Sequence, residues 1–519
     1  MSHDHQRGSG GVIAGHIDSV DSSGSMFQAI DASTGETLPG RFGETPPARI
    51  HDACAAAKGA FEGFASAGGG DRGKLLCELS TAMADHRDSI IERCRAETGY
   101  LPTRVEVEFE RTIYQLRLFG RLAEQVAWDD RVTDPAEPDR PGRPKPELRR
   151  RLFALGPVAV FGACNFPLAI SVLGNDTVAA FAVGCPVVIK SHPGHPGTCE
   201  LLGRIATSVI GQLGFSAGIF SLIHGRMPST AVQLVQNPHI AAVGFTGSPT
   251  AGRALADAVA RRDRPIPVFA ELGSTNPVFV TEAAARARTE GIAAGFVSSL
   301  LFGNGQMCTK PGLLVMTKAA SEMLIPVIQS RISRMDAQPL LNENVAAGFD
   351  AGVTRWRDHP QVDELTPRSH PPAPGPFHRR AVLMMAEIAN LDEVHELLHE
   401  ETFGPLSLVI VCGSENDWID VAGQVRGSLT ATLHSEPSDD DLANQWLARA
   451  WRFGGRVIHN DWPTGIEIGP ATHHGGPYPA SLDGRSTSIG HASLERFVRP
   501  VCFQNWSSES LGSMWSIDK

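Results

Sequence analysis

PVAVFGACNFPLAISVLGNDTVAAFAVGCPVVIK, residues 157–190, is the stretch that decides the fold. Val158–Phe161 and Pro186–Lys190 are apolar runs of strand length, and the mostly apolar segment 168–183 between them is long enough for a buried helix. Strands that alternate with helices in this way form a parallel, doubly wound α/β sheet.

The same alternation continues beyond this stretch. The expected elements are a helix at 200–213, a strand at 220–223, a helix at 229–236 and a strand at 240–245. Ligands of doubly wound sheets bind at the carboxyl ends of the strands. We therefore expect a binding site in the loops after Phe161, Ile189 and Phe245.

The segment before this sheet has helical periodicity. We expect helices at about 53–64, 74–97 and 105–126, where apolar residues recur at helical spacing. Gly68–Gly73 spells GxGxxG, the pattern of a dinucleotide-binding loop, but it follows a helix and not a strand. We interpret it as a plain loop between two helices.

Two segments differ in composition from the rest. Asp, Pro and Arg dominate residues 128–150, which lead into the run LRRR at 148–151, and we interpret this segment as an extended arm. A basic patch for phosphate groups is the alternative, which the acidic balance of the chain and the lack of interleaved aromatic residues disfavour. Residues 355–380 are crowded with Pro, His and Arg, and we interpret them as a surface excursion.

The overall composition excludes several classes of protein. The formal net charge of −11 argues against nonspecific nucleic-acid binding. The nine cysteines are scattered and form no CxxC pair, so we expect no metal site and reduced thiols, as in the cytoplasm. The N-terminus lacks the apolar core of a signal peptide, and no apolar run reaches the roughly 18 residues of a membrane span. We expect a cytoplasmic enzyme with neither a nucleic-acid nor a membrane partner.

Cys308 is the strongest candidate for chemistry. The apolar run 291–302 predicts a buried helix, and Gly303 and Gly305 end it because glycine tolerates the backbone angles of a tight exit. Cys308 then lies on a turn, in the segment Gly305–Pro311. A thiol held that way is a nucleophile once its pKa is lowered or its proton removed. A small buried apolar side chain is the alternative for any free cysteine.

Four segments together resemble the aldehyde dehydrogenase family. They are Asn165-Phe166-Pro167, Glu271-Leu272-Gly273, Gly305-Gln306-Met307-Cys308 and Glu401-Thr402-Phe403-Gly404-Pro405. Each motif alone is modest, but the four in this order and spacing are highly specific, and the likeness covers nearly the whole chain. Four further segments are similar to one branch, which holds α-ketoglutaric semialdehyde dehydrogenases and NADP-dependent bacterial fatty aldehyde dehydrogenases: 165–169, 190–198, 462–465 and 474–480.

The resemblance implies that Cys308, Glu271 and Asn165 are catalytic. An aldehyde carbon must gain a sulfur or oxygen substituent before hydride can leave, and the Cys308 thiolate would give a thiohemiacetal. The Asn165 amide and the Cys308 backbone N–H are the implied oxyanion donors, each worth roughly 3–4 kcal/mol. Glu271 is the implied general base for thioester hydrolysis, a task for which burial raises a carboxyl pKa. Taken singly, Asn165 could be a turn residue before proline and Glu271 a structural carboxylate.

The resemblance also implies a nicotinamide cofactor. The implied contacts are Lys190, His192, Pro193, Gly247, Ser248, Leu272, Glu401 and Phe403. NAD-preferring relatives often carry a glutamate three positions after the lysine, where this chain has Pro193. Without that carboxylate a 2′-phosphate meets no like charge, while Lys190 attracts it and Arg226 is a second candidate cation. We therefore expect NADP, with NAD also accepted.

The family resemblance sets the expected architecture: an α/β chain with a Rossmann-type cofactor lobe, an α/β catalytic lobe and a β-strand bridging element for oligomerisation. We expect the cofactor lobe at 1–127 and 153–273, the catalytic lobe at 274–475, the bridging element at 128–152 and 476–505, and a polar tail at 506–519. Because the arm pairs with another subunit in the family, a homodimer or homotetramer is expected.

The expected reaction is NAD(P)-dependent oxidation of a small aldehyde, α-ketoglutaric semialdehyde (2,5-dioxopentanoate), to the carboxylic acid. Medium- or long-chain aliphatic aldehydes are the alternative substrates. A cysteine acyl hydrolase that uses Cys308 without nicotinamide, and a non-catalytic scaffold, are the alternatives of another class. No histidine lies near Cys308 in the sequence, although one could approach it in space.

Overall fold

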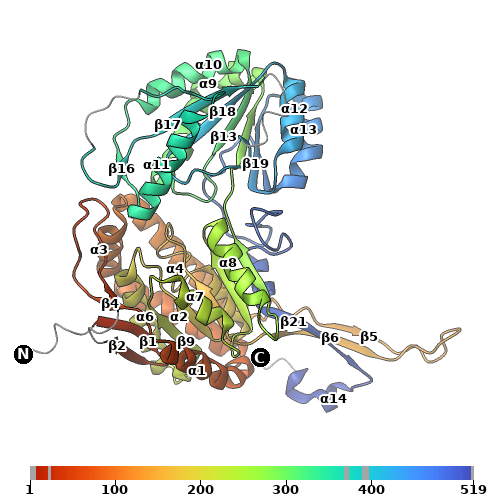
Figure 1. The fold of residues 1–519 in the computed structure, drawn as a ribbon. Coiled ribbons are helices and arrows are strands. Elements are labelled where there is room, and N and C mark those ends of the chain that lie inside the picture. Colours follow the sequence, from red (N-terminus) through yellow and green to blue (C-terminus); the bar gives the residue numbers. More distant parts are fainter. Residues whose placement is uncertain (1–7, 21–24, 368–372, 389–396, 516–519) are drawn as a thin grey trace, which may run out of the picture.

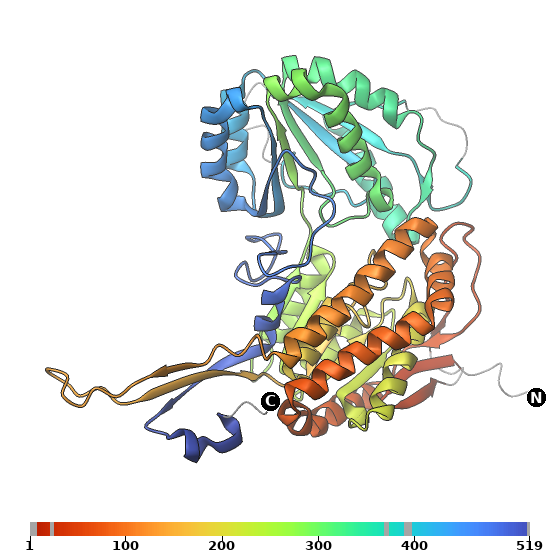
Figure 2. The ribbon, with the colours of Figure 1, turned by 180° about the vertical axis from the view of Figure 1, so that it is seen from behind.

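The computed structural model describes residues 8–20, 25–367, 373–388 and 397–515. The chain forms two α/β lobes, one above the other in Figure 1, and a long arm that projects from the lower lobe (Figures 1 and 2). Each lobe is organised around a mainly parallel sheet with helices packed against it, which confirms the predicted α/β class.

The sheet of the lower lobe has the strand order β11-β10-β7-β8-β9-β1-β4-β3, with β2 paired to β1. Its parallel part consists of β7 (Val158–Phe161), β8 (Val187–Lys190), β9 (Phe220–Ile223), β10 (Ala242–Thr246) and β11 (Val268–Glu271). Its other strands are β1 (Gly8–Ile13), β2 (His16–Val20), β3 (Met26–Phe27) and β4 (Phe42–Gly43). The four strands expected at 158–161, 186–190, 220–223 and 240–245 are confirmed within two residues at each end. The parallel strands end at one edge of the sheet, where the predicted site loops begin.

The helices of this lobe cover both faces of the sheet. They are α1 (Pro47–Ser66), α2 (Gly69–Asp85), α3 (Arg87–Thr98), α4 (Pro102–Glu124), α5 (Asn175–Val183), α6 (Pro196–Gln212), α7 (Pro228–Gln236) and α8 (Pro249–Ala260). The single helix expected at 74–97 is divided at His86, which leaves the helical conformation with φ −104° and ψ 15°. Apolar periodicity continues through this break, so the pattern could not show it.

The interpretation of Gly68–Gly73 as a loop was wrong. Gly68 caps α2, and the glycines that follow form its first turns. A Cβ at Gly69 would lie 2.4 Å from the Ala123 carbonyl oxygen of α4, and one at Gly73 would lie 2.7 Å from that of Gly120. These glycines therefore allow α2 and α4 to approach closely.

The helix expected at 168–183 begins only at Asn175. The segment before it folds back on itself instead, since the Ala163 N–H donates to the Ile170 carbonyl at 2.8 Å. The Glu108 carboxylate of α4 accepts the backbone N–H of Leu168 at 2.9 Å and of Ala169 at 3.0 Å. Apolar composition does not distinguish such a buried loop from a buried helix.

The upper lobe has a second sheet, with the strand order β15-β17-β18-β13-β12-β19-β20. The strands are β12 (Pro277–Val280), β13 (Leu313–Thr317), β15 (Asp363–Glu364), β17 (Val382–Glu387), β18 (Leu406–Cys412), β19 (Ser428–His434) and β20 (Gly454–His459). The helices are α9 (Glu282–Leu301), α10 (Lys318–Ile332), α11 (Glu343–Asp358), α12 (Glu415–Gln424) and α13 (Asp440–Phe453). All pairs are parallel except β15 with β17.

The predicted surface excursion at 355–380 is only partly correct. It begins within α11, where Trp356 is buried in the core of the upper lobe. It then includes β15 and β16 (His378–Arg379), and β16 pairs with β14 (Gln338–Pro339). Residues 368–372, at its centre, lie outside the described residues.

The arm is a three-stranded antiparallel sheet in which β6 is central. Its strands are β5 (Val132–Asp134), β6 (Leu148–Ala154) and β21 (Val498–Gln504). The chain after β21 was expected to be a polar tail, but it forms the short helix α14 (Ser508–Leu511) and returns to the arm. There the Arg149 guanidinium lies 5.3 Å from the centre of the Trp515 ring. Among the described residues, no helix is both long and apolar enough to cross a membrane.

Candidate active site

Cys308 lies on a turn between the two lobes. Helix α9 ends at Leu301, and Gly303, Asn304 and Gly305 then take positive φ angles that reverse the chain. A Cβ at Gly305 would lie 2.5 Å from the Gly404 backbone, so only glycine fits there.

A buried asparagine fixes the other side of this turn. The Asn276 amide donates to the Cys308 carbonyl at 2.8 Å and to the Lys310 carbonyl at 2.9 Å. The thiol is therefore carried by a backbone that is held on both sides, while its side chain remains partly accessible.

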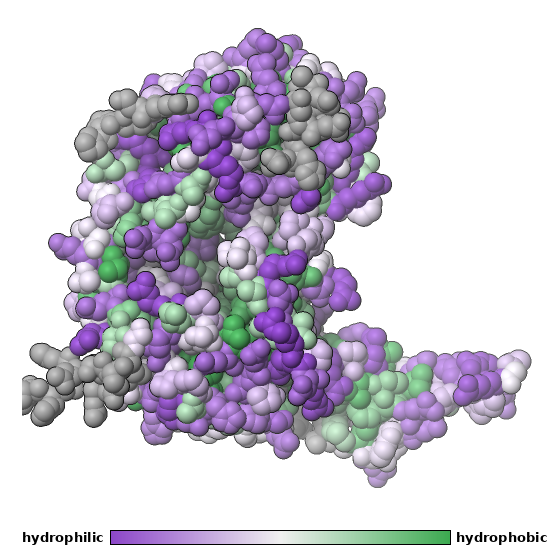
Figure 3. Space-filling model, viewed as in Figure 1, coloured by the Kyte–Doolittle hydropathy of each residue, from purple (hydrophilic) through white to green (hydrophobic). Residues whose placement is uncertain are grey.

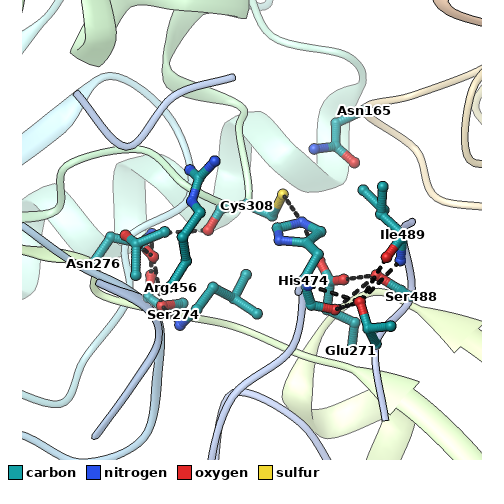
Figure 4. A network of polar contacts seen from close by, with 12 residues as sticks. Asn165, Glu271, Ser274, Asn276, Cys308, Arg456, His474, Ser488 and Ile489 are labelled. Carbon is teal, nitrogen blue, oxygen red and sulfur yellow. Dashed lines mark hydrogen bonds and ion pairs between the residues drawn. The ribbon is translucent and has the colours of Figure 1, made fainter. Parts of the chain in front are cut away.

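Three reactive side chains converge at this turn (Figure 4). His474 Nε2 lies 3.4 Å from Cys308 Sγ and 3.3 Å from Glu271 Oε1. The sulfur, the imidazole nitrogen and the carboxylate oxygen all lie within 4.8 Å of one another. Cysteine, histidine and carboxylate are also ligand types of zinc, so the same atoms could hold a metal ion.

Residues 487 and 488 fix the orientation of this group. Glu271 is the last residue of β11, and its carboxylate accepts a hydrogen bond from the Ser488 hydroxyl. The Thr487 hydroxyl accepts the His474 backbone N–H at 2.7 Å. Nδ1 of His474 is buried without a partner among the described residues, whereas Nε2 faces two acceptors. We therefore assign the imidazole proton to Nε2.

Burial dominates the ionisation of this cluster. It raises the pKa of Glu271 to about 7, against the opposing Ser488 hydrogen bond. It lowers the pKa of His474 to about 3, an effect that the nearby charges of Arg456 and Arg111 reinforce, so the imidazole is neutral at pH 7. Burial and the Glu271 charge raise the pKa of the Cys308 thiol, and Arg111 and Arg456 oppose this rise. The carboxyl group is thus the base whose pKa is closest to neutral pH.

Asn165 lies near Cys308 in Figure 4, on the loop after β7. Its amide nitrogen donates to the Gln306 carbonyl at 2.9 Å. The backbone carbonyl of Asn165 accepts a hydrogen bond from the Arg104 guanidinium at 3.2 Å. Arg104 also forms a buried ion pair with Glu108 at 2.6 Å. The Arg104–Glu108 pair therefore holds the loop that carries Asn165.

The N-terminus of α8 provides a candidate site for a pyrophosphate. Gly247–Thr250 are exposed between β10 and the first turn of α8, and Ser248 caps the helix by accepting the Ala251 N–H at 3.3 Å. The Gly247 N–H donates to the Glu271 carbonyl at 3.1 Å, which links this loop to the catalytic strand. A free helix N-terminus attracts anions, so these residues fit a dinucleotide.

Glu401 and the loop after it close the space between Cys308 and β11. Its carboxylate accepts the Ser274 N–H at 3.1 Å, and a Cβ at Gly273 would lie 2.3 Å from Glu401 Oε2. Lys310 Nζ donates to the carbonyls of Thr402 and Leu406, each at 2.7 Å, and so holds the half-buried Phe403 in place. Burial raises the pKa of Glu401 and lowers that of Lys310.

Lys190 is the last residue of β8, and His192 and Pro193 follow it at the same edge of the lower sheet. Lys190 Nζ donates to the Gly225 carbonyl at 2.6 Å. The residue after Gly225 is the exposed Arg226. The ring of His192 accepts the Gly194 N–H at 3.0 Å and lies half-buried beside Pro193. Burial lowers the pKa of Lys190 to about 8.

Leu272, the last of the expected cofactor contacts, is buried, and its N–H donates to the Ala480 carbonyl at 2.8 Å. The structure thus brings Cys308, Glu271 and Asn165 close to one another. Figure 3 shows apolar side chains in the hollow between the lobes.

Sequence reasoning assigned no role to His474, Ser488, Arg111 or Arg456. The motif at 474–480 was recognised as typical of one branch, and its first residue is the histidine that reaches Cys308. The separation of 166 residues between the two gave no local signal. For the arginines, no pattern distinguished them from others on the same elements.

The comparisons with known proteins identify the family of the chain. The model of the aldehyde dehydrogenase family matches residues 19–500. Alpha-ketoglutaric semialdehyde dehydrogenase 2 from Azospirillum brasilense is 37% identical over 95% of this chain and 94% of its own length. Alpha-ketoglutaric semialdehyde dehydrogenase from Acinetobacter baylyi is 35% identical over 93% of this chain and 91% of its own.

A solved structure of 1-pyrroline-5-carboxylate dehydrogenase from Thermus with bound NAD has the same fold. Its TM-score is 0.82 at 20% identity, over 96% of this chain and 93% of that one. The family match spans most of the chain, and two relatives exceed 30% identity over nearly all of it. The chain belongs to the aldehyde dehydrogenase family and is an oxidoreductase that acts on aldehydes.

Proposed function

We propose that this enzyme oxidises 2,5-dioxopentanoate to 2-oxoglutarate with NADP, through a thiohemiacetal and a thioester on Cys308. The observation that carries the chemistry is the convergence of Cys308 Sγ, His474 Nε2 and Glu271 Oε1 within 4.8 Å. The two curated relatives named for α-ketoglutaric semialdehyde support the substrate.

The reaction begins with formation of the Cys308 thiolate. Glu271 accepts the thiol proton, because its carboxylate belongs to the same cluster as the Cys308 thiol and burial raises the pKa of this carboxyl to about 7. His474 is a positioning residue whose Nε2–H donates to the sulfur as its charge forms. The charges of Arg111 and Arg456 favour the thiolate further.

Attack of the thiolate on the aldehyde carbon places negative charge on the aldehyde oxygen. We assign the Asn165 amide and the Cys308 backbone N–H to this oxyanion. In the structure the Asn165 amide donates to the Gln306 carbonyl at 2.9 Å, which holds it next to Cys308 until the substrate arrives. Each such donor is worth roughly 3–4 kcal/mol in the transition state.

When bound, the nicotinamide supplies the hydride acceptor that converts the thiohemiacetal into a thioester. Once Glu271 has released the thiol proton to solvent, its carboxylate takes a proton from water. The resulting hydroxide attacks the thioester carbonyl, the carbon–sulfur bond breaks, and Cys308 leaves as the thiolate with release of the carboxylic acid. The Ser488 hydroxyl keeps the carboxylate at this position for both proton transfers.

The proposed cofactor site uses Gly247, Ser248 and the N-terminus of α8 for the pyrophosphate. Leu272 would line the site, and Glu401 and Phe403 would hold the nicotinamide ribose and ring. Lys190, His192, Pro193 and Arg226 would hold the adenosine ribose. The nearby Glu44 carboxylate accepts hydrogen bonds from the backbone of Arg226 and Met227 and from the Thr230 hydroxyl, and its charge acts on Lys190.

The preference for NADP can be tested by restoring the missing acid. Pro193→Glu places a carboxylate beside Lys190, where it opposes a 2′-phosphate by roughly 1–4 kcal/mol. We expect the ratio of the NADP and NAD specificity constants to fall at least about tenfold. The measurement is kcat/KM for both cofactors in wild type and variant. An unchanged or higher ratio would remove Pro193 from the ribose site.

We place the enzyme in the cytoplasm as a homodimer or homotetramer. All nine cysteines are free thiols, as expected in a reducing compartment. The arm exposes Val132, and the segment packed against it exposes Trp506 and Met514. Apolar side chains on a projecting arm are suited to contact with another subunit. We retain the division into a cofactor lobe (1–127, 153–273), a catalytic lobe (274–475) and a bridging element (128–152, 476–505).

A substrate panel tests the proposed function. We expect the highest kcat/KM for 2,5-dioxopentanoate, then succinic semialdehyde, with glycolaldehyde and hexanal at least tenfold lower. The absorbance of reduced nicotinamide reports the reaction. A reaction with thioesters in the absence of cofactor that exceeds aldehyde oxidation would favour a cysteine acyl hydrolase, which the 3.4 Å contact between Cys308 and His474 makes the second candidate.

A further inference from the structure

Arg111 is a cation near Cys308 that forms no ion pair with any residue that the structure describes. It lies on α4, and its guanidinium is 5.6 Å from the centre of the Phe166 ring. Phe166 belongs to the apolar cluster that packs against Cys308. Nε and Nη2 of Arg111 are buried and have no hydrogen-bond partner among the described residues.

Arg104 lies about two turns earlier on α4 and is a buried arginine whose charge has a partner. It forms an ion pair with Glu108 at 2.6 Å and donates to the Asn165 carbonyl at 3.2 Å. Arg111 forms no ion pair within the described part of the chain, although it lies beside the same Phe166 ring. A buried cation with unmade donors is costly, so a structure retains one where a ligand completes it.

Arg456, on β20, adds a second positive charge beside Cys308 (Figure 4). Its Nη1 donates to the Gly465 carbonyl at 2.8 Å, and Nη2 donates to the Pro463 carbonyl. Both acceptors are neutral, and Nε has no partner in the described chain. The charge of Arg456 is therefore fixed in place and not cancelled by a carboxylate in contact with it.

We propose that Arg111, supported by the charge of Arg456, forms a carboxylate-binding subsite for the end of the substrate remote from the aldehyde. Nε and Nη2 are neighbouring donors on one edge of the guanidinium, the pair that binds the two oxygens of a carboxylate side by side. The Phe166 ring, 5.6 Å from the Arg111 guanidinium, adds a cation–π contact on one side. This inference rests on the proposed function, and it names the residues that recognise the acid group.

The subsite would restrict the length and the charge of the substrate. The aldehyde carbon must reach Cys308 while the carboxylate reaches Arg111, so short aldehydes with a terminal carboxylate fit both ends. An alkyl aldehyde would leave the buried guanidinium unpaired, which a site built for hydrogen bonding rejects strongly. The class of ligand is therefore a short acid that carries the aldehyde at its opposite end.

Arg111→Leu tests this assignment through a ratio of two substrates. The ratio of kcat/KM for 2,5-dioxopentanoate to that for pentanal should fall about 100-fold. Arg111→Lys, which keeps the charge but loses the paired donors, should give an intermediate ratio. Any effect of Arg111 on the Cys308 thiolate, or on the fraction of folded enzyme, acts on both substrates and cancels in the ratio.

Arg117→Leu is the matched control, because it removes the same charge from an exposed position of the same helix. It should leave the ratio unchanged. As a second measurement, 2-oxopentanoate, which carries a methyl group in place of the aldehyde, should compete with pentanal in wild type and about 100-fold more weakly in Arg111→Leu.

The outcomes separate the two claims. A wild-type enzyme that prefers 2,5-dioxopentanoate, with a ratio that stays within twofold in Arg111→Leu, overturns the subsite. A wild-type enzyme that does not prefer 2,5-dioxopentanoate to pentanal overturns the proposed substrate instead. In that case the competition by 2-oxopentanoate still tests whether Arg111 binds a carboxylate.

Discussion

Cys308 and Cys199 each contact a histidine ring, but in different surroundings. Cys308 Sγ lies 3.4 Å from His474 Nε2, and Cys199 Sγ lies 3.2 Å from His195 Nδ1. Cys199 is fully buried in the first turn of α6, where neither water nor substrate reaches it. Cys308 lies on a turn at the cleft between the lobes and remains partly exposed.

The two histidines differ as well. His195 Nε2 lies 3.1 Å from the Ala163 carbonyl, so both of its ring nitrogens have protein partners. Burial lowers its pKa, but the charge and hydrogen bond of Cys199 outweigh burial and raise it to about 9. His474 has a pKa of about 3 and shares one nitrogen between the thiol and a carboxylate.

The comparison shows that contact between cysteine and histidine does not by itself make a nucleophile. Cys308 has, in addition, access from the cleft and a carboxylate with a pKa near neutral pH. Cys199 contacts the His195 ring and the Ser171 hydroxyl but is fully buried. The shorter contact belongs to the thiol that we expect to be inert.

Replacing each thiol by alanine should produce the largest difference between the two regions. Cys308→Ala should lower kcat for aldehyde oxidation by at least about 10⁴-fold, since the covalent step is lost. Cys199→Ala should stay within about threefold, because it only shortens a buried side chain. Steady-state kinetics with 2,5-dioxopentanoate measures both, with cofactor binding as the control for folding. A larger loss in Cys199→Ala would reverse our assignment of the nucleophile.

His474→Gln should have the next largest effect. The amide can still donate a hydrogen bond but is not held in the same plane, so kcat should fall about 100-fold. The rate at which iodoacetamide alkylates Cys308 should fall as well, and its pH profile should move to higher pH. The same change at the other pair, His195→Gln, should leave the alkylation of Cys308 unaltered. Equal alkylation profiles in wild type and His474→Gln would exclude a role for His474 in thiolate formation.

The pH dependence of kcat should follow the ionisation of Glu271, the carboxylate beside Cys308. Burial raises the pKa of Glu271 to about 7, and the ionised form is the base. Protonation therefore removes the base as the pH falls, so kcat should decrease about tenfold per unit below pH 7 and level off above it. Cys199→Ala should keep this profile. A kcat that is flat between pH 5 and 8 would show that Glu271 does not titrate in this range.

Much of the fold could be predicted because strands of the lower sheet are apolar on both faces. Val158–Phe161 and Val187–Lys190 match their predicted bounds closely for this reason. The segment 168–174 could not be assigned, because its conformation depends on Glu108 of a distant helix. Gly69 and Gly73 matched a loop pattern, yet their function is contact with α4, which only the packing shows.

Some residues of the candidate site could be predicted from the sequence, and others could not. Cys308, Glu271 and Asn165 lie in short motifs with a recognisable order, and the structure places all three at one cleft. Their catalytic roles stay predictions. His474 and Arg111 carry no local signal, because their relation to Cys308 exists only after the chain has folded.

Trapping the covalent intermediate tests the central claim most directly. Glu271→Gln cannot take a proton from water, so the thioester should accumulate on the enzyme after a burst of one reduced cofactor per active site. The variant is incubated with 2,5-dioxopentanoate and NADP, digested and analysed by peptide mass spectrometry. Our account predicts the acyl group on the peptide that contains Cys308 and an unmodified peptide with Cys199. Acylation of Cys199, or a burst with no acyl group on Cys308, would contradict it.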